Sequence, residues 1–137
     1  MSRRSGADRA TRARDDGGSA VVDFVLIGAL TTVLFLAVVQ LTLALHVRAT
    51  LVDCAAEGAR YGALRDRTPE DGAARARDLI EMSLAPSYAQ DVSASVEEID
   101  GMPVVRVEVS APLPLVGLLG PSGRLTVDGN ALQESGT

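Results

Sequence analysis

The sequence predicts an α+β protein. We expect a long N-terminal transmembrane helix that continues outward, followed by a small extracytoplasmic head with one helix and a three-stranded antiparallel sheet. The helix is indicated by an uncharged apolar run near the N-terminus. The sheet is indicated by two alternating apolar and polar segments that flank an Asp-Gly pair. The length of 137 residues suits one small domain with appendages.

The apolar run extends from Phe24 to Leu45 and contains 22 consecutive uncharged residues. A helix of this length is roughly 33 Å long, enough to cross a hydrocarbon core of about 30 Å. A soluble helix of the same length would normally keep one polar face, which this segment lacks. The run therefore predicts a membrane helix.

Charge is divided unevenly on the two sides of this run. Residues 1–18 carry five arginines and three acidic residues, whereas the chain from His46 onward carries eight arginines and fourteen acidic residues. Basic flanks stay in the cytoplasm, so we expect a cytoplasmic N-terminus and a head outside the membrane. All thirteen basic residues are arginine, a bias typical of GC-rich bacterial genomes. The acidic balance and the few aromatics argue against a nucleic-acid partner.

These changes in composition divide the chain into a basic leader (1–18), the membrane helix with its outward extension (19–64) and the head (65–137). Three fates of the leader are open. An ordinary secretory signal has an apolar stretch of about 7–15 residues, shorter than the one here, and residues 44–46 form a poor cleavage site. An uncleaved signal anchor fits both charge and length. The third fate is cleavage just before the helix.

The residues that precede the helix favour this third fate. Gly17-Gly18 is expected to interrupt any helix that continues from the leader, with Ser19 as the N-cap of the membrane helix. Asp23 is surrounded by valine, phenylalanine and leucine, so its carboxylate enters the apolar zone and needs a partner. Cleavage after Gly18 would create a cation at Ser19. That amine on a neighbouring copy or a related subunit is a suitable partner for Asp23.

Gly18 and the following Ser19-Ala20-Val21-Val22-Asp23-Phe24 resemble a type IV prepilin-type processing site. Residues 55–60, Ala-Ala-Glu-Gly-Ala-Arg, resemble the alanine-rich motif of TadE-like proteins, minor pseudopilins of the tight-adherence (Flp) pilus system. This resemblance covers roughly Gly18 to Arg60. Aspartate stands here where the family usually has glutamate, and Gly28-Ala29 stands where it often has proline.

The resemblance implies cleavage between Gly18 and Ser19 by a membrane aspartic prepilin peptidase. It also implies that Asp23 takes the role of the carboxylate five residues after the cut. The partners that it implies are the membrane, the peptidase, other pilins or pseudopilins, and pilus-assembly proteins.

The outward extension of the helix has an apolar seam with spacings of four and three residues. The seam consists of Val47, Leu51, Cys54, Gly58 and Tyr61. Two partners are open: the protein's own head, or a helix of another subunit. The single cysteine allows no intrachain disulfide, and we expect its side chain to be a small buried hydrophobe.

In the head, Thr68 and Asp71 form a weak capping box with Pro69 at the first helical position, which predicts a helix from 69 to about 84. Residues 91–99 and 102–110 alternate around Asp100-Gly101, a signal for a type I′ hairpin.

The predicted hairpin pairs Val92 with Val109, Ala94 with Val107, Val96 with Val105 and Ile99 with Met102. Residues 123–131 suit a third strand. The apolar, proline-broken segment 112–120 is too short for a second span.

No set of residues suggests catalysis. His46 is the only histidine and is best interpreted as a polar residue where the helix leaves the bilayer. The carboxylates of Glu97, Glu98 and Asp100 gather at the hairpin tip without calcium-ligand spacing. We expect no enzymatic activity, cofactor, metal site or small-molecule substrate.

Overall fold

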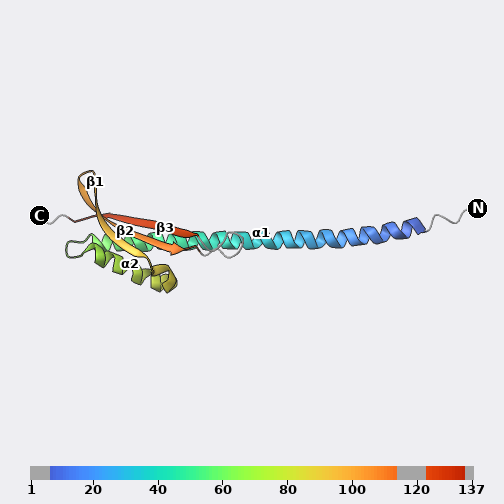
Figure 1. Cartoon of the computed structure of the whole chain (residues 1–137), viewed down its shortest axis with the longest axis horizontal. Coiled ribbons are helices and arrows are strands. Elements are labelled where there is room, and N and C mark those ends of the chain that lie inside the picture. Colours follow the sequence, from blue (N-terminus) through green and yellow to red (C-terminus); the bar gives the residue numbers. More distant parts are fainter. Residues whose placement is uncertain (1–6, 114–122, 135–137) are drawn as a thin grey trace, which may run out of the picture. The chain divides into compact units, whose positions relative to one another are not determined.

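The computed structural model describes residues 7–113 and 123–134, with side chains from residue 15. These residues form two helices, a short 3-10 helix and three strands in the order α1, α2, η1, β1, β2 and β3. Figure 1 labels the two helices and the three strands. The long apolar helix, the further helix and the three-stranded antiparallel sheet confirm the predicted α+β class. The chain divides into two units, Met1–Val39 and Gln40–Thr137.

Helix α1 (Ala7–Gly62) continues through Gly17, Gly18 and Ser19. The predictions of a helix break at Gly17-Gly18 and of a helix N-cap at Ser19 are therefore wrong. Glycine lowers helix stability by about 1 kcal/mol relative to alanine, but it keeps its N–H and adopts helical dihedral angles. A pair of glycines inside a long helix is therefore a weak point, not a stop. The other end of α1 lies two residues before the expected Leu64.

In the first unit, the described side chains of α1 are exposed. Residues 15–62 contain an apolar stretch long enough to cross a membrane, none of which is buried within the protein. The hydroxyls of Thr31 and Thr32 donate to the carbonyls of Ile27 and Gly28, each at 2.8 Å. These polar groups are satisfied by their own helix, as an apolar surrounding requires. The helix is thus suited to a membrane.

Helix α2 (Pro69–Ser83) begins at the predicted capping box. The hydroxyl of Thr68 accepts from the Asp71 N–H at 3.2 Å, and the Asp71 carboxylate accepts from the Thr68 N–H at 2.9 Å. The helix ends at Ser83, close to the predicted Leu84, and is followed by η1 (Pro86–Ala89). Both helix termini therefore follow from local sequence signals.

Strands β1 (Val92–Ile99) and β2 (Met102–Pro112) form the predicted hairpin. All four predicted pairs are present: Val92 with Val109, Ala94 with Val107, Val96 with Val105 and Ile99 with Met102. Asp100 and Gly101 have φ angles of 53° and 76°, the two positive values that a type I′ turn requires. The register and turn predictions are confirmed.

Strand β3 (Arg124–Leu132) pairs antiparallel with β2 and completes the sheet in the order β1-β2-β3. It lies within one residue of the predicted third strand. Pro112 belongs to β2, and the rest of the predicted apolar loop, from residue 114 on, lies outside the described residues.

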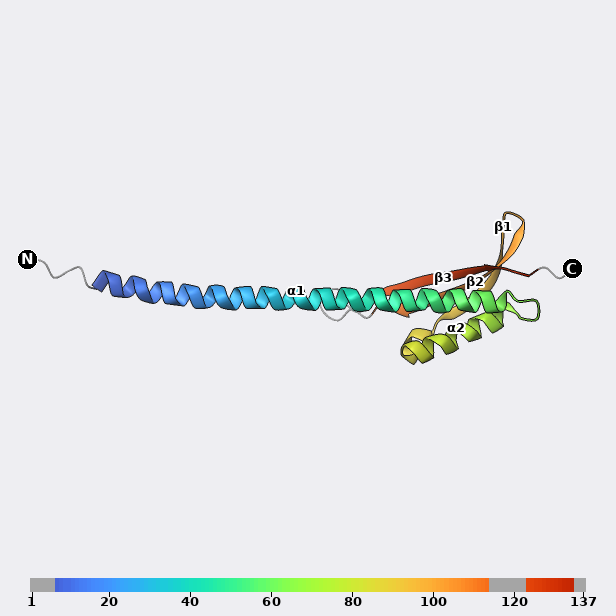
Figure 2. The same cartoon turned by 180° about the vertical axis from the view of Figure 1, so that it is seen from behind.

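The core of the second unit lies between the part of α1 from Gln40 onward, helix α2 and one face of the sheet. In Figure 2, β3 runs alongside α1, whereas α2 packs on another side of the same helix. Leu51, Ile80, Val105, Val107 and Val109 are the largest fully buried side chains of this core. The structure therefore groups the helix from Gln40 onward with the head, whereas the sequence-based division at 64/65 follows composition.

The candidate processing site and the small-residue face of helix α1

The Gly18–Ser19 peptide bond lies within α1 and is exposed. A Cβ atom added to Gly17 or Gly18 would meet no heavy atom within 4 Å. In the described part of the chain, nothing therefore shields this bond from an approaching enzyme, but the bond is in a helical conformation.

Asp23 lies four residues after Ser19, and positions four apart share one face of a helix. Its side chain is exposed, and among the described residues it forms no ion pair. The neighbouring side chains of Val22 and Phe24 are exposed and apolar. A carboxylate in such a surrounding needs a cation from outside the described structure when the helix is in a membrane.

The predicted seam faces the protein's own head. Val47, Leu51, Cys54 and Gly58 are buried, and Tyr61 is half-buried. Leu51 and Cys54 belong to the same core cluster as Ile80 of α2 and Val107 of β2. Of the two partners left open by the sequence, the structure shows the intramolecular one.

Tyr61 closes the far end of this seam. The guanidinium carbon of Arg67 lies 4.7 Å from the Tyr61 ring centroid, and that of Arg75 lies 5.9 Å from it. Both separations fall within the range of cation–π attraction. The aromatic ring thus links the end of α1 to the following loop and to α2.

Glycines allow α1 and α2 to approach closely. A Cβ atom on Gly58 would lie 2.6 Å from the Gly72 carbonyl oxygen and 2.8 Å from the Ala76 Cβ. A Cβ atom on Gly62 would lie 3.1 Å from the Gly72 Cα. Because backbone atoms occupy this space, larger side chains at these positions would push the two helices apart.

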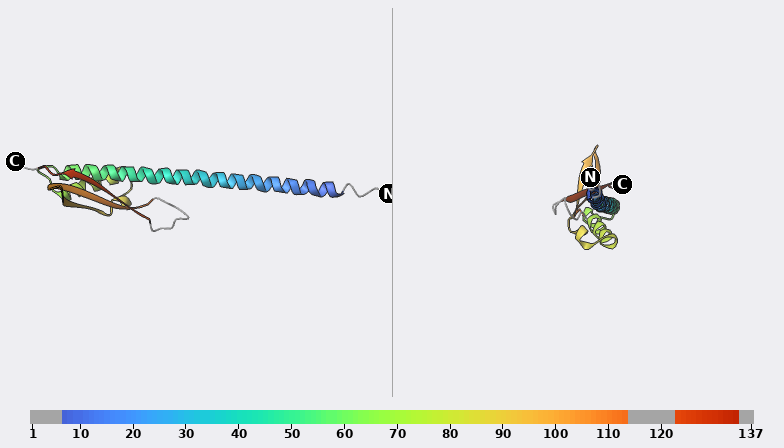
Figure 3. Two further views of the ribbon diagram at one scale, coloured as in Figure 1. Left: turned by 90° about the horizontal axis from the view of Figure 1, so that it is seen from above. Right: turned by 90° about the vertical axis from the view of Figure 1, so that its right-hand side faces the viewer.

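Glycine also allows β3 to approach α1 from another direction. A Cβ atom on Gly129 would overlap the backbone of Ala55 and Ala56. Figure 3 (right) views the molecule along α1 and shows α2 and β3 on different sides of it. The small residues Ala55, Ala56, Gly58 and Ala59 thus lie where one helix contacts a second helix and a strand.

Sequence reasoning missed Gly72 and Gly129 as members of this contact. An isolated glycine within a strand pattern often marks a close approach of another backbone, so the sequence around Gly129 could have indicated this contact. Gly72, a glycine within a helix pattern, is a weaker indication of such a contact. Which backbone each would meet depends on tertiary packing.

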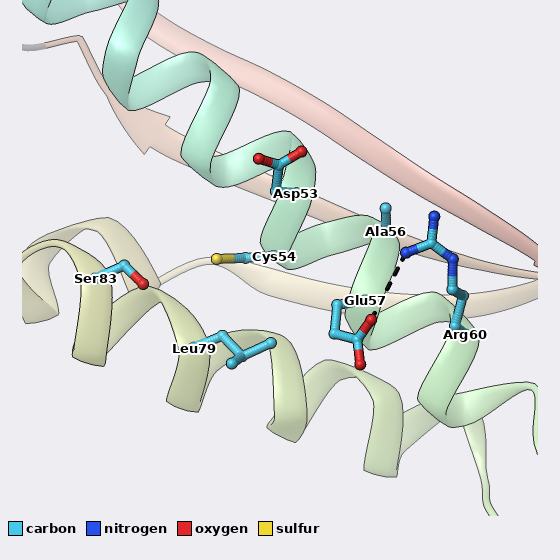
Figure 4. A pocket seen from close by; sticks show the side chains of 7 residues that line it. All are labelled: Asp53, Cys54, Ala56, Glu57, Arg60, Leu79 and Ser83. Atoms are coloured by element: carbon cyan, nitrogen blue, oxygen red, sulfur yellow. Dashed lines mark ion pairs between the residues drawn. The ribbon is translucent and has the colours of Figure 1, made fainter.

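A shallow groove of about 400 Å³ runs between α1 and α2 (Figure 4). Its lining residues are Asp53, Cys54, Ala56, Glu57, Arg60, Leu79 and Ser83. The Glu57 carboxylate and the Arg60 guanidinium are 3.6 Å apart, and both are largely exposed. An exposed pair of this kind contributes little stability.

Burial raises the pKa of the Cys54 thiol, and the neighbouring Asp53 carboxylate raises it further. With 6% of its surface exposed, the side chain behaves as the predicted small hydrophobe. The raised pKa keeps the thiol protonated at pH values where an unfolded thiol would begin to ionise. Because thiolate is the reactive form, we expect Cys54 to react slowly in the folded protein.

We therefore predict that iodoacetamide alkylates Cys54 at least tenfold more slowly in the native protein than in urea at pH 8. The double variant C54A/S83C moves the thiol to an exposed position in the same groove and is expected to react rapidly in both conditions. Mass spectrometry of the labelled chain measures both rates. Equal rates for native and urea-unfolded wild-type protein would contradict this account of Cys54.

Among the carboxylates predicted to gather at the hairpin tip, Glu97 instead pairs with Arg106 on β2 at 3.3 Å. Asp128 lies on the other side of the same guanidinium at 3.6 Å. Asp128 and then Glu97 raise the pKa of Arg106. These residues form a charged row on the solvent face of the sheet. Within the described ranges, no group of three or more His, Cys, Asp or Glu residues could hold a metal ion.

The class of protein defined by these features has one long helix that contains an apolar stretch and whose C-terminal part is built into the core of a small α+β head. The family model of TadE-like proteins matches residues 18–60, from the candidate processing site to the end of the small-residue motif. This match confirms the resemblance seen in the sequence. The matched region contains the apolar stretch of α1 that is long enough to cross a membrane. No curated protein and no solved structure matches the chain.

Proposed function

We propose that this chain is a TadE-like minor pseudopilin, cleaved between Gly18 and Ser19 by a prepilin peptidase. It would take part in the assembly of a tight-adherence (Flp-type) pilus or a related secretion apparatus. The observation that carries this proposal is the family match over residues 18–60. It is supported by the exposed Gly18–Ser19 bond and by the lack of an ion pair at Asp23 among the described residues.

In this proposal the cytoplasmic leader is removed and Ser19 becomes the N-terminus. The new ammonium group of one subunit pairs with the Asp23 carboxylate of a neighbouring copy or a related pseudopilin. Burying either charge alone in the apolar zone would be costly, so the pairing selects one axial register between adjacent helices. The carboxylate thus distinguishes an assembly helix from a simple anchor.

Lateral contacts would come from the membrane part of α1. Its apolar side chains are exposed throughout residues 24–39, and no described residue of the first unit covers them. The seam from Val47 to Tyr61 is already used by the protein's own head. We therefore assign subunit pairing to the part of the helix before Gln40, and stabilisation of the head to the part after it.

An uncleaved single-pass membrane protein with an extracytoplasmic binding head is the second candidate. The observation that favours it is the unbroken α1, which passes through residues 17–19 without exposing an extended backbone. This candidate retains the membrane helix and the head but needs neither peptidase nor subunit register.

The N-terminus of the protein isolated from bacterial membranes distinguishes these candidates. Intact-mass measurement and N-terminal sequencing are expected to show a chain that starts at Ser19. A chain that retains residues 1–18 would support the uncleaved anchor. A start beyond residue 44 would indicate ordinary secretory cleavage and would overturn both candidates.

A further inference from the structure

The scissile bond of the proposed function lies inside a regular helix. In an α-helix each carbonyl accepts from the N–H four residues later, so the carbonyls of Gly17 and Gly18 face the amides of Val21 and Val22. A peptidase needs access to both faces of the bond that it hydrolyses, and a helical peptide group has its carbonyl engaged along the helix axis. The segment around Gly18 must therefore open before it can be cleaved.

Opening is favoured by the position of this segment. Ser19 lies twelve residues after Ala7, the first residue of α1. The described side chains around Ser19 are exposed and make no core contacts. The end of a helix that makes no tertiary contacts opens at a low cost in free energy, much lower than that of unfolding the whole helix. Its helical state thus depends mainly on the helix propensities of its own residues.

We propose that Gly17 determines the rate of processing, because it makes the helix around the Gly18–Ser19 bond easier to open. This inference rests on the proposed function, since it concerns the same cleavage. Gly17 is exposed, and a Cβ atom there would meet no described atom within 4 Å, so its lack of a side chain serves no packing. The presence of glycine at position 17, in addition to Gly18, lowers the stability of the helix.

The reaction is hydrolysis of one peptide bond. One water molecule is consumed, the C–N bond between Gly18 and Ser19 breaks, Gly18 gains a carboxylate and Ser19 gains an amine. Gly17 takes no part in this chemistry. It sets the fraction of precursor whose backbone is open, and the cleavage rate follows that fraction when opening and closing are fast relative to cleavage.

The test uses the full-length precursor in membranes with an active prepilin peptidase and follows the loss of residues 1–18 with time. Gly17→Ala is expected to slow cleavage by a factor of about four to five, the difference in helix propensity between the two residues. Gly28→Ala is the matched control. Gly28 lies in the same helix and also has no neighbour within 4 Å, so its replacement is expected to leave the rate unchanged.

A second variant separates helix opening from direct recognition of Gly17 by the peptidase. A13G/G17A moves the glycine one helical turn toward the N-terminus and is expected to restore most of the wild-type rate. Hydrogen exchange of the Val21 and Val22 amides in the isolated precursor provides an independent readout. Exchange is expected to slow by the same factor in Gly17→Ala and to recover in A13G/G17A.

An unchanged cleavage rate in Gly17→Ala would overturn this inference and leave the proposed function intact. Slow cleavage in both Gly17→Ala and A13G/G17A, with unchanged hydrogen exchange, would show that the peptidase recognises glycine at position 17 directly. That result would also overturn this inference. Absence of cleavage in the wild-type chain would instead remove the proposed function.

Discussion

Replacing Gly129 by valine is expected to prevent the head from folding. A single added Cβ atom would already overlap the backbone of Ala55 and Ala56, and valine adds two further methyl groups. Flexible side chains can move aside, but a helix backbone built into the core cannot. Overpacking typically costs about 1–3 kcal/mol. The loss here is expected at or above the top of that range, which is a large part of the stability of a small domain.

Limited trypsin digestion and thermal unfolding of the full-length protein in detergent measure this effect. Gly129→Val is expected to expose the arginines of the head to rapid cleavage. Asn130→Val places the same side chain at the next residue of β3, where the side chain is exposed, and should remain resistant. A Gly129→Val protein with wild-type melting temperature would refute the close contact between β3 and α1.

Replacing Asp23 by alanine is expected to leave the protein inserted in the membrane but unable to assemble. If the carboxylate pairs with the Ser19 amine of a neighbour, its removal leaves a buried cation without a partner. Breaking a buried pair in this way costs about 3–5 kcal/mol, more than a hundredfold in the association constant. Co-purification of other pilus subunits after solubilisation of the membrane measures the loss.

Two variants control for charge and reach. Asp53→Ala removes an exposed carboxylate of the same helix that lies outside the apolar run and remains after cleavage, and this variant should assemble normally. Asp23→Glu retains the charge with one more methylene and should assemble at least as well as wild type. Recovery of the same partners from Asp23→Ala as from wild type would remove the assembly role from this residue.

The parts of the fold that sequence predicted well are those determined by neighbouring residues. The hairpin register depends on alternation and on a turn whose Asp100 and Gly101 need positive φ angles. The start of α2 depends on two hydrogen bonds between Thr68 and Asp71. Both signals span only a few residues, so no tertiary information was needed.

Two other features depended on a balance of energies or on distant contacts. Gly17-Gly18 was expected to break α1, but the loss of helix propensity was too small to stop a helix that continues for more than forty residues. The seam from Val47 to Tyr61 had the right spacing for either partner. The shared core of Leu51 and Cys54 with α2 and the sheet, together with the close approach of Gly58 to Gly72, showed that the head itself occupies it.

The central claim, that this chain is processed as a pseudopilin, is tested most directly by its intact mass in two otherwise identical bacterial strains. One strain carries an active prepilin peptidase and the other lacks it. The account predicts a chain that begins at Ser19 in the first strain and one that retains residues 1–18 in the second. Retention of the leader in both strains, or its loss in both, would contradict the account.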